Sequence, residues 1–152
     1  MALNEDIELL SGVALFGDIG EDKLRLIAFG AERRKLQAGQ TLFRENTPAD
    51  CAYVVAEGRL ELSRTNRQGH SETLGAAERG TLLSELAMIS AVDRKMTAIA
   101  LDHAEVIRIN RPLFRRMLEE YPEIAGVVRE RIAANLADLN AGLDKIASRF
   151  SE

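Results

Sequence analysis

The stretch that decides the fold is GTLLSELAMISAVDRKMTAIA, residues 80–100. It places a carboxylate, Glu85, and a guanidinium, Arg94, among residues that are mostly small or apolar. A short helix whose first turn holds Ser84 and Glu85 would present free backbone N–H groups and the positive end of its dipole, which together attract an anion. If this helix folds back, Arg94 at the start of the next strand reaches the same point.

The two charged side chains suit one kind of ligand. A cyclic phosphodiester carries a single negative charge on two exposed oxygens, which match a fixed guanidinium and backbone donors. A ribose hydroxyl beside that phosphate suits an acceptor carboxylate such as Glu85. Because glutamate–arginine pairs are common, the alternative is that Glu85 and Arg94 only bridge an empty pocket.

Length and composition predict one globular domain. The chain has 152 residues, 46% of them apolar and 29% charged, with a net charge of -4, and a chain of this size buries a core of its own. The acidic balance disfavours nucleic-acid binding, which usually needs a basic face. The single cysteine, Cys51, suits a reducing compartment. With neither a signal-peptide pattern nor a long apolar stretch, the sequence predicts a cytoplasmic protein that does not span a membrane.

The hydrophobic pattern divides the chain into three zones. Residues 1–30 have apolar residues at three- and four-residue spacing and predict N-terminal helices. Residues 31–110 consist of short, partly alternating runs separated by turn residues, and predict strands of a sandwich or roll. Residues 111–152 predict C-terminal helices, with Pro112 as the first residue of one helix and Pro122 interrupting or restarting it.

The last zone carries a heptad seam. Its members, spaced alternately by four and three residues, are Ile132, Leu136, Leu139, Leu143, Ile146 and Phe150. Such a seam is narrower than the apolar face of an ordinary surface helix, so we expect it to form a homodimer or to receive a partner helix. The alternative is that the seam folds back on the same domain, and Gly142 weakens the helix by about 1 kcal/mol.

This arrangement resembles the cyclic nucleotide-binding domain family, which includes the catabolite activator protein and the regulatory subunit of protein kinase A. Family members have a turn glycine before the second strand, as Gly39 in LQAGQTLF, and another after the third, as Gly58 in AYVVAEGRLEL. Their phosphate-binding cassette typically reads G-x-x-F-G-E-L-A-L, a spacer, and P-R-[ST]-A-[ST]. Residues 80–97 align with it without a gap, and the matching residues are Gly80, Glu85, Leu86, Ala87, Arg94 and Thr97.

The resemblance implies an α+β, mainly β, fold in a single domain of residues 1–152. The expected architecture is an eight-stranded antiparallel β-roll, jelly-roll-like, with N-terminal helices and a long C-terminal helix. It also implies that Glu85 binds the ribose 2′-hydroxyl and Arg94 the phosphate of cAMP or cGMP. The expected ligand-binding residues are Ser84, Glu85, Leu86, Arg94, Lys95, Met96 and Thr97. We expect no catalytic residues, no metal and no cofactor beyond this ligand, because no catalytic or metal-binding motif is present.

Four cassette residues depart from the family pattern. Ser84 replaces a glycine, which costs about 1–2 kcal/mol if the position needs a positive φ, although serine could instead cap the short helix. Lys95 replaces a serine or threonine and keeps the N–H without the hydroxyl. Met96 replaces an alanine and fills ligand space if it points inward. Asp93 replaces a proline and puts a second acid beside Arg94.

Two functions remain open from the sequence. One is a regulatory module that senses a cyclic nucleotide and relays the signal through its C-terminal helix to a partner or second protomer. The other is a ligand-independent dimerisation or scaffold module of the same fold. Family regulators place a helix-turn-helix after the long helix, whereas this sequence stops at Glu152, so we expect no DNA binding. We expect a stand-alone sensor, as the initial methionine favours, or a fragment of a longer protein.

Overall fold

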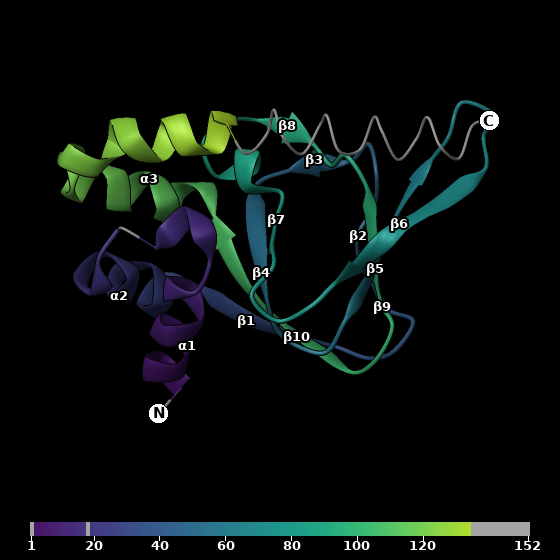
Figure 1. Cartoon of the computed structure of the whole chain (residues 1–152), viewed down its shortest axis with the longest axis horizontal. Helices are drawn as coiled ribbons and strands as arrows, with labels where there is room; N and C mark the ends of the chain where they lie inside the picture. Colours follow the sequence, from purple (N-terminus) through teal and green to yellow (C-terminus); the bar gives the residue numbers. More distant parts are fainter. Residues whose placement is uncertain (1, 18, 135–152) are drawn as a thin grey trace.

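The computed structural model describes residues 2–17 and 19–134. Helices gather at one end of a β-roll and pack against one of its two larger sheets (Figure 1). The helices are α1 (Ala2–Ser11), the 3-10 helix η1 (Ala14–Phe16), α2 (Glu21–Gly30), the 3-10 helix η2 (Glu85–Met88), α3 (Arg111–Glu120) and a further helix over 122–134. The predicted three-zone order of helix, β structure and helix is confirmed.

The strands form two larger antiparallel sheets and one small ladder. They are β1 (Glu32–Leu36), β2 (Thr41–Phe43), β3 (Pro48–Ala49), β4 (Cys51–Glu57), β5 (Leu60–Thr65), β6 (Ser71–Ala77), β7 (Leu82–Leu83), β8 (Val92–Asp93), β9 (Thr97–Ala100) and β10 (Ala104–Asn110). The sheets run β1-β10-β4-β7 and β2-β9-β5-β6, and β3 pairs with β8. The described chain thus has the predicted antiparallel roll, with ten strands against eight expected because the two-residue β3 and β8 form a ladder of their own.

Strand β4 is buried on both faces and separates two cores. Its run CAYVVAE is apolar up to the last residue, which is typical of a strand covered on each side. Cys51, Tyr53 and Val55 face the inside of the roll with residues from the other sheet. The alternating residues, Val54 among them, face the helices. One strand therefore serves as the wall between the roll interior and the helical layer.

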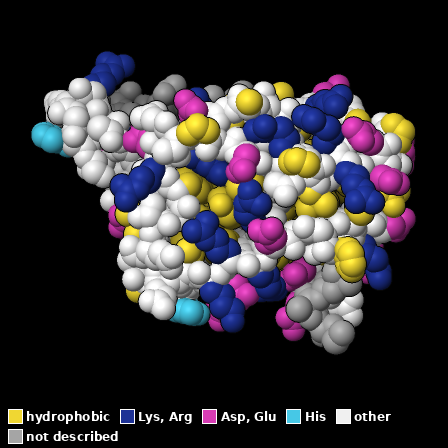
Figure 2. Space-filling view, turned by 180° about the vertical axis from the view of Figure 1, so that it is seen from behind, with side chains coloured by type: hydrophobic (Ala, Val, Ile, Leu, Met, Phe, Trp, Pro, Cys, Tyr) yellow, Lys and Arg dark blue, Asp and Glu magenta, His cyan; other side chains and the backbone are white. Residues whose placement is uncertain are grey.

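An ion-pair cluster ties the N-terminal helix to the roll. Arg33 on β1 bonds to Asp6 of α1 and also pairs with Glu105 of β10, with 2.9 Å between Nη1 and Oε1. Burial alone would lower the pKa of Arg33, but both carboxylates outweigh it and the pKa lies above its ordinary value. On the face shown in Figure 2, basic and acidic side chains are interspersed rather than segregated by sign.

The C-terminal helices begin where the sequence predicts, within a residue. The Asn110 side chain caps α3 by accepting a hydrogen bond from the Leu113 N–H at 2.8 Å, and Pro112 lies in the first turn. Tyr121 leaves the helical conformation and a new helix begins at 122, as Pro122 predicts.

The first residue of the predicted seam packs within its own chain. Ile132 is fully buried in the core formed by the helices and the outer face of β4. The other five seam residues lie outside the described residues. The dimer therefore stays a prediction.

One predicted turn glycine has a clear steric reason. Gly58 adopts a φ of 77°, and a Cβ placed there would lie 2.4 Å from the backbone oxygen of His103. The β4–β5 turn therefore passes too close to the end of the β9–β10 connection for any other residue. Gly39 also has a positive φ, 86°, but a Cβ at that position would have open space around it, with no atom within 4 Å.

Candidate ligand-binding site

The cassette forms β7, η2, β8 and the start of β9. The short helix predicted there is a 3-10 helix of four residues, Glu85–Met88. It is too short to supply the helix-terminus anion site that the sequence suggested, because few peptide dipoles align in it. Any charge recognition at this place must come from side chains and individual N–H groups.

Ser84 has the left-handed conformation that the family glycine would adopt without strain. Its φ is 62° and its ψ is 41°, and its side chain makes no capping hydrogen bond. The alternative role of Ser84 as a helix cap therefore lacks the bond that defines it. A residue with a Cβ in this conformation costs about 1–2 kcal/mol.

The cassette encloses a cavity of about 160 Å³. The predicted ligand-binding residues that line it are Ser84, Glu85, Leu86, Lys95 and Met96. Most of the remaining wall is apolar and includes Phe43, Leu62 and Leu83. Pockets that hold drug-sized ligands usually measure about 300–1,000 Å³, so this cavity must enlarge to take a nucleotide.

All four departures from the family pattern, Ser84 among them, line this cavity. Met96 points inward, is only 9% exposed and joins the core inside the roll. Lys95 and Asp93 line the cavity but are exposed to solvent. The altered residues thus reduce the space and place one cation and one acid at its edge.

Arg94 is buried beside the cavity rather than in it. It is 5% exposed, and its guanidinium donates to the Cys51 carbonyl oxygen at 2.8 Å and to the Cys51 Sγ at 3.3 Å. Its Cζ lies 4.6 Å from the ring centre of Phe43 and 5.4 Å from that of Tyr53. The cavity lining includes both sequence neighbours of Arg94 but not Arg94 itself.

Thr97, the first residue of β9, does not line the cavity. Its hydroxyl accepts a hydrogen bond from the Glu45 N–H at 2.9 Å, and it pairs with Ser63 in the β5–β9 register. Five of the seven predicted ligand-binding residues therefore line the cavity, while Arg94 and Thr97 do not.

The residues around Arg94 form an electrostatically linked group. Burial alone would raise the pKa of Asp50, but a hydrogen bond from the Cys51 thiol and the charge of Arg108 outweigh it, so the pKa lies below its ordinary value. Burial raises the pKa of Tyr53, and the adjacent Cys51 adds to that rise. The two pKa shifts favour an ionised Asp50 carboxylate and a neutral Tyr53 hydroxyl, which are the states of these groups at neutral pH.

Arg111 connects the cassette to α3, although no sequence pattern singles it out as a site residue. Its guanidinium donates to the carbonyl oxygens of Ala87 in η2 at 3.0 Å and of Ala49 in β3 at 2.7 Å. Its backbone N–H donates to the Asp50 carbonyl at 2.9 Å. The only sequence signal is its place between the capping Asn110 and Pro112, which marks a helix start but no partner.

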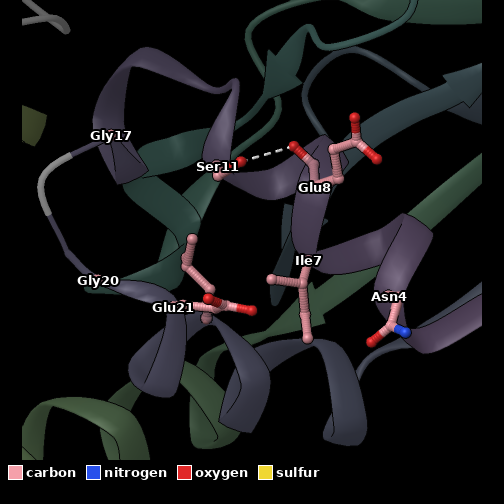
Figure 3. A pocket seen from close by; sticks show the side chains of 8 residues that line it. Asn4, Ile7, Glu8, Ser11, Gly17, Gly20 and Glu21 are labelled. Carbon is pink, nitrogen blue, oxygen red and sulfur yellow. Dashed lines mark hydrogen bonds between the residues drawn. The ribbon is translucent and has the colours of Figure 1, made fainter.

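A second cavity, of about 270 Å³, lies between α1 and α2 (Figure 3). Glu8 and Glu21 are among its lining residues, and the Ser11 hydroxyl donates to the backbone oxygen of Glu8 at 2.7 Å. Among the described residues, the lining of this second cavity includes no Lys or Arg to balance these carboxylates, whereas Lys95 lines the cassette cavity. Because uncompensated carboxylates repel an anion, the second cavity is a poorer candidate for a phosphate-bearing ligand than the one at the cassette.

The described part of the chain contains neither a metal-binding cluster nor a helix suited to crossing a membrane. No three His, Cys, Asp or Glu side chains gather there in a way that could hold a metal ion. None of the helices described has both the length and the apolar character needed to cross a bilayer.

Comparison with known proteins identifies the family. The family model for the cyclic nucleotide-binding domain matches residues 33–121, which include the entire cassette. The chain belongs to the cyclic nucleotide-binding domain family. This family model describes a binding domain, and its span runs from β1 to the end of α3.

Three relatives show how far the likeness extends. A cyclic nucleotide-binding-like protein from Brucella abortus is 43% identical, with a TM-score of 0.69 over 76% of this chain and 98% of that one. The cyclic AMP receptor protein of Thermus thermophilus is 23% identical over 91% of this chain, which spans 64% of that protein. The regulatory domain of Toxoplasma gondii protein kinase A, crystallised with cAMP, has the same fold with a TM-score of 0.77 at 17% identity, over 90% of this chain and 50% of that one.

Proposed function

We propose that this domain is a regulatory module that senses cAMP or cGMP at the cassette cavity. The observation that carries the proposal is that five cassette side chains of a cyclic nucleotide-binding domain converge on one cavity. The Thermus relative is named for cyclic AMP, and the Toxoplasma relative was crystallised with it. In this proposal Glu85 accepts from the ribose hydroxyl, and Arg94 turns from its present contacts toward the phosphate.

The small cavity links binding to a conformational change. A nucleotide needs more room than about 160 Å³, so Met96 and the η2 segment must shift as it enters. A ligand moves an equilibrium only when it prefers one of two states, and an enlarged cavity is a state that the nucleotide alone would favour. Binding therefore supplies a displacement of η2 that a partner can detect.

Arg111 provides a route from η2 to the C-terminal helices. Because its guanidinium spans Ala87 and Ala49, movement of η2 changes a contact at the first residue of α3. The helix at 122–134 follows α3 directly, so a shift of α3 changes where that helix begins. We propose that the signal leaves the domain along this path, toward a partner or a second protomer.

Titration with both nucleotides tests the sensing function. Each is added to the whole protein in a calorimeter and in urea unfolding, and a nucleotide at 100 times its dissociation constant should stabilise the fold by about 2.7 kcal/mol. Arg94→Gln should abolish this gain, whereas Arg59→Gln, on an exposed arginine paired with Asp102, should leave it unchanged. Flat titrations with cAMP and cGMP at millimolar concentration would overturn the sensing function.

Hydrogen exchange tests the relay separately. Nucleotide should change the exchange of amides in 122–134, and Arg111→Gln should remove that change while retaining nucleotide binding. Arg115→Gln, an exposed arginine on the same helix, is the matched control. An unchanged response in Arg111→Gln would exclude Arg111 from the relay.

A ligand-independent scaffold is the second candidate. It is favoured by the inward Met96 and by the contacts that hold Arg94 on Cys51. In both candidates we propose a homodimer through the heptad seam, in the cytoplasm and without binding to DNA or to a membrane. Leu139→Asp combined with Leu143→Asp should give a monomer in sedimentation, and an unchanged mass would remove the dimer from the proposal.

A further inference from the structure

Cys51 supplies both hydrogen-bond acceptors for the Arg94 guanidinium. One guanidinium nitrogen, Nη1, donates to its carbonyl oxygen at 2.8 Å, and the other, Nη2, donates to its Sγ at 3.3 Å. Phe43 and Tyr53, whose rings stack with centres 5.9 Å apart, both contact the same cation. A buried cation is costly unless it is paired or hydrogen-bonded, so these contacts define a distinct resting position.

The two acceptors on Cys51 differ in what they depend on. Any residue at position 51 would offer the carbonyl oxygen, because β4 fixes the backbone there. The sulfur belongs to the side chain, and as a weak acceptor it holds Nη2 less firmly than an oxygen would. Cys51 is fully buried and does not line the cavity, so changing it leaves the cavity wall in place.

We propose that the Cys51 thiol sets the resting position of Arg94 and so limits the affinity of the cavity for a cyclic phosphate. The affinity part rests on the proposed function. Nucleotide binds the state in which Arg94 has left Cys51, and the apparent dissociation constant rises as the population of that state falls. Cys51 is then a positioning residue, acting on the ligand only through Arg94.

Substitutions at position 51 give the first test. Cys51→Ala should lower the dissociation constant for cAMP or cGMP about fivefold, the equivalent of losing one hydrogen bond worth about 1 kcal/mol. Cys51→Val, which also lacks an acceptor but fills the site, should do the same and replaces alanine if that variant folds poorly. Cys51→Ser keeps an acceptor, and because oxygen accepts more strongly than sulfur, its affinity should equal or fall below that of the parent.

A double-mutant cycle separates positioning from a general structural effect. In an Arg94→Lys background, which keeps the cation but lacks the forked guanidinium that reaches both Cys51 acceptors, Cys51→Ala and Cys51→Val should no longer change nucleotide affinity. A purely structural role would lower affinity in both backgrounds. The proposal is overturned if Cys51→Ala and Cys51→Val leave nucleotide affinity unchanged or lower it. It is also overturned if they raise affinity equally when Arg94 is replaced.

A ligand-free measurement keeps this inference distinct from the proposed function. Phenylglyoxal modifies accessible arginines, and mass spectrometry reports the rate at each one. Arg94 should react slowly in the parent and in Cys51→Ser, and several-fold faster in Cys51→Ala and Cys51→Val, with exposed Arg59 as the internal reference. If Arg94 is equally protected from phenylglyoxal in all four proteins, the proposal is overturned. If Arg94 reacts faster in Cys51→Ala and Cys51→Val but no variant binds nucleotide, the proposed function is overturned, while the role of Cys51 in holding Arg94 is retained.

Discussion

Replacing Ser84 with glycine should stabilise the ligand-free protein, although glycine usually weakens a fold. Ser84 has a φ of 62° and no capping bond to offset its strain, and a left-handed residue with a Cβ costs about 1–2 kcal/mol. Glycine has more conformational freedom in the unfolded chain, which lowers the free energy of unfolding by about 0.5–1 kcal/mol. The expected net gain is about 0.5–1 kcal/mol, which raises Tm by roughly 2 °C in a domain of this size.

Urea unfolding with a matched control measures this gain. Ser71→Gly changes an exposed serine at the start of β6 that does not have a positive φ, so it should lose about 0.5–1 kcal/mol. The two variants should therefore differ by about 1–2 kcal/mol, the strain at position 84. If Ser84→Gly loses as much free energy of unfolding as Ser71→Gly, the backbone strain does not exist in solution and the reasoning fails.

The same variant has a consequence for binding. Ser84 lines the cassette cavity, so its loss removes a Cβ and a hydroxyl from the wall. Nucleotide affinity should then rise above that of the parent. A stability gain without an affinity gain would show that Ser84 strains the fold without excluding the ligand.

Three further substitutions probe packing, pH dependence and backbone crowding. Met96→Ala should lose about 2 kcal/mol of unfolding free energy in urea, at the low end for a core methionine because it borders a cavity, and should bind nucleotide more tightly in calorimetry. Asp50→Asn should reduce the loss of unfolding free energy at acid pH. Because the pKa of Asp50 is lowered in the folded state, the Asp50 carboxylate stabilises the fold above its ordinary pKa of 3.8, and this stabilisation is lost as pH falls through the pKa of the folded state. Gly58→Ala should lose about 2–4 kcal/mol in the same urea assay, because a Cβ meets the His103 backbone.

Each of these has a control within the chain. Met117→Ala, in the core on the helical side, should lose stability without any gain in affinity, and an equal gain would contradict the role of Met96. In an Arg108→Gln background the effect of Asp50→Asn should shrink, since Arg108 helps to lower that pKa. Gly39→Ala has a positive φ but open space and should cost only about 1 kcal/mol; a similar loss at both glycines would exclude crowding at Gly58.

The β-roll could be predicted from the sequence because its signals are local. Alternation in runs such as RLELSRT and turn glycines such as Gly58 act within a few residues, and the in-register cassette added the family. The continuous apolar run CAYVVAE is typical of a strand that is buried on both faces, as β4 is. The two-residue strands β3 and β8 escaped prediction because a ladder that short leaves no period to detect.

The site could be predicted only in part because its contacts cross the chain. The sequence placed Ser84, Glu85 and Met96 at one pocket, and they meet there. It offered no means to see that Arg94 would turn toward Cys51, since that contact joins the β8–β9 connection to the start of β4, far away in the sequence. Nothing near Arg111 indicates that its partners lie in η2 and β3. The partners of Arg94 and Arg111 depend on tertiary geometry, which the periodicity of the sequence does not encode.

The double burial of β4 has a consequence for any attempt to reduce this domain. A fragment cut to the roll alone would expose Ala52, Val54 and Ala56 to water, because these residues face the helices. The strand that supplies the acceptors for Arg94 would then carry an apolar stripe at its surface, a liability for aggregation. Because β4 belongs to both cores, we expect the roll and its helical cover to melt in one cooperative step, so that a minimal sensor must keep both.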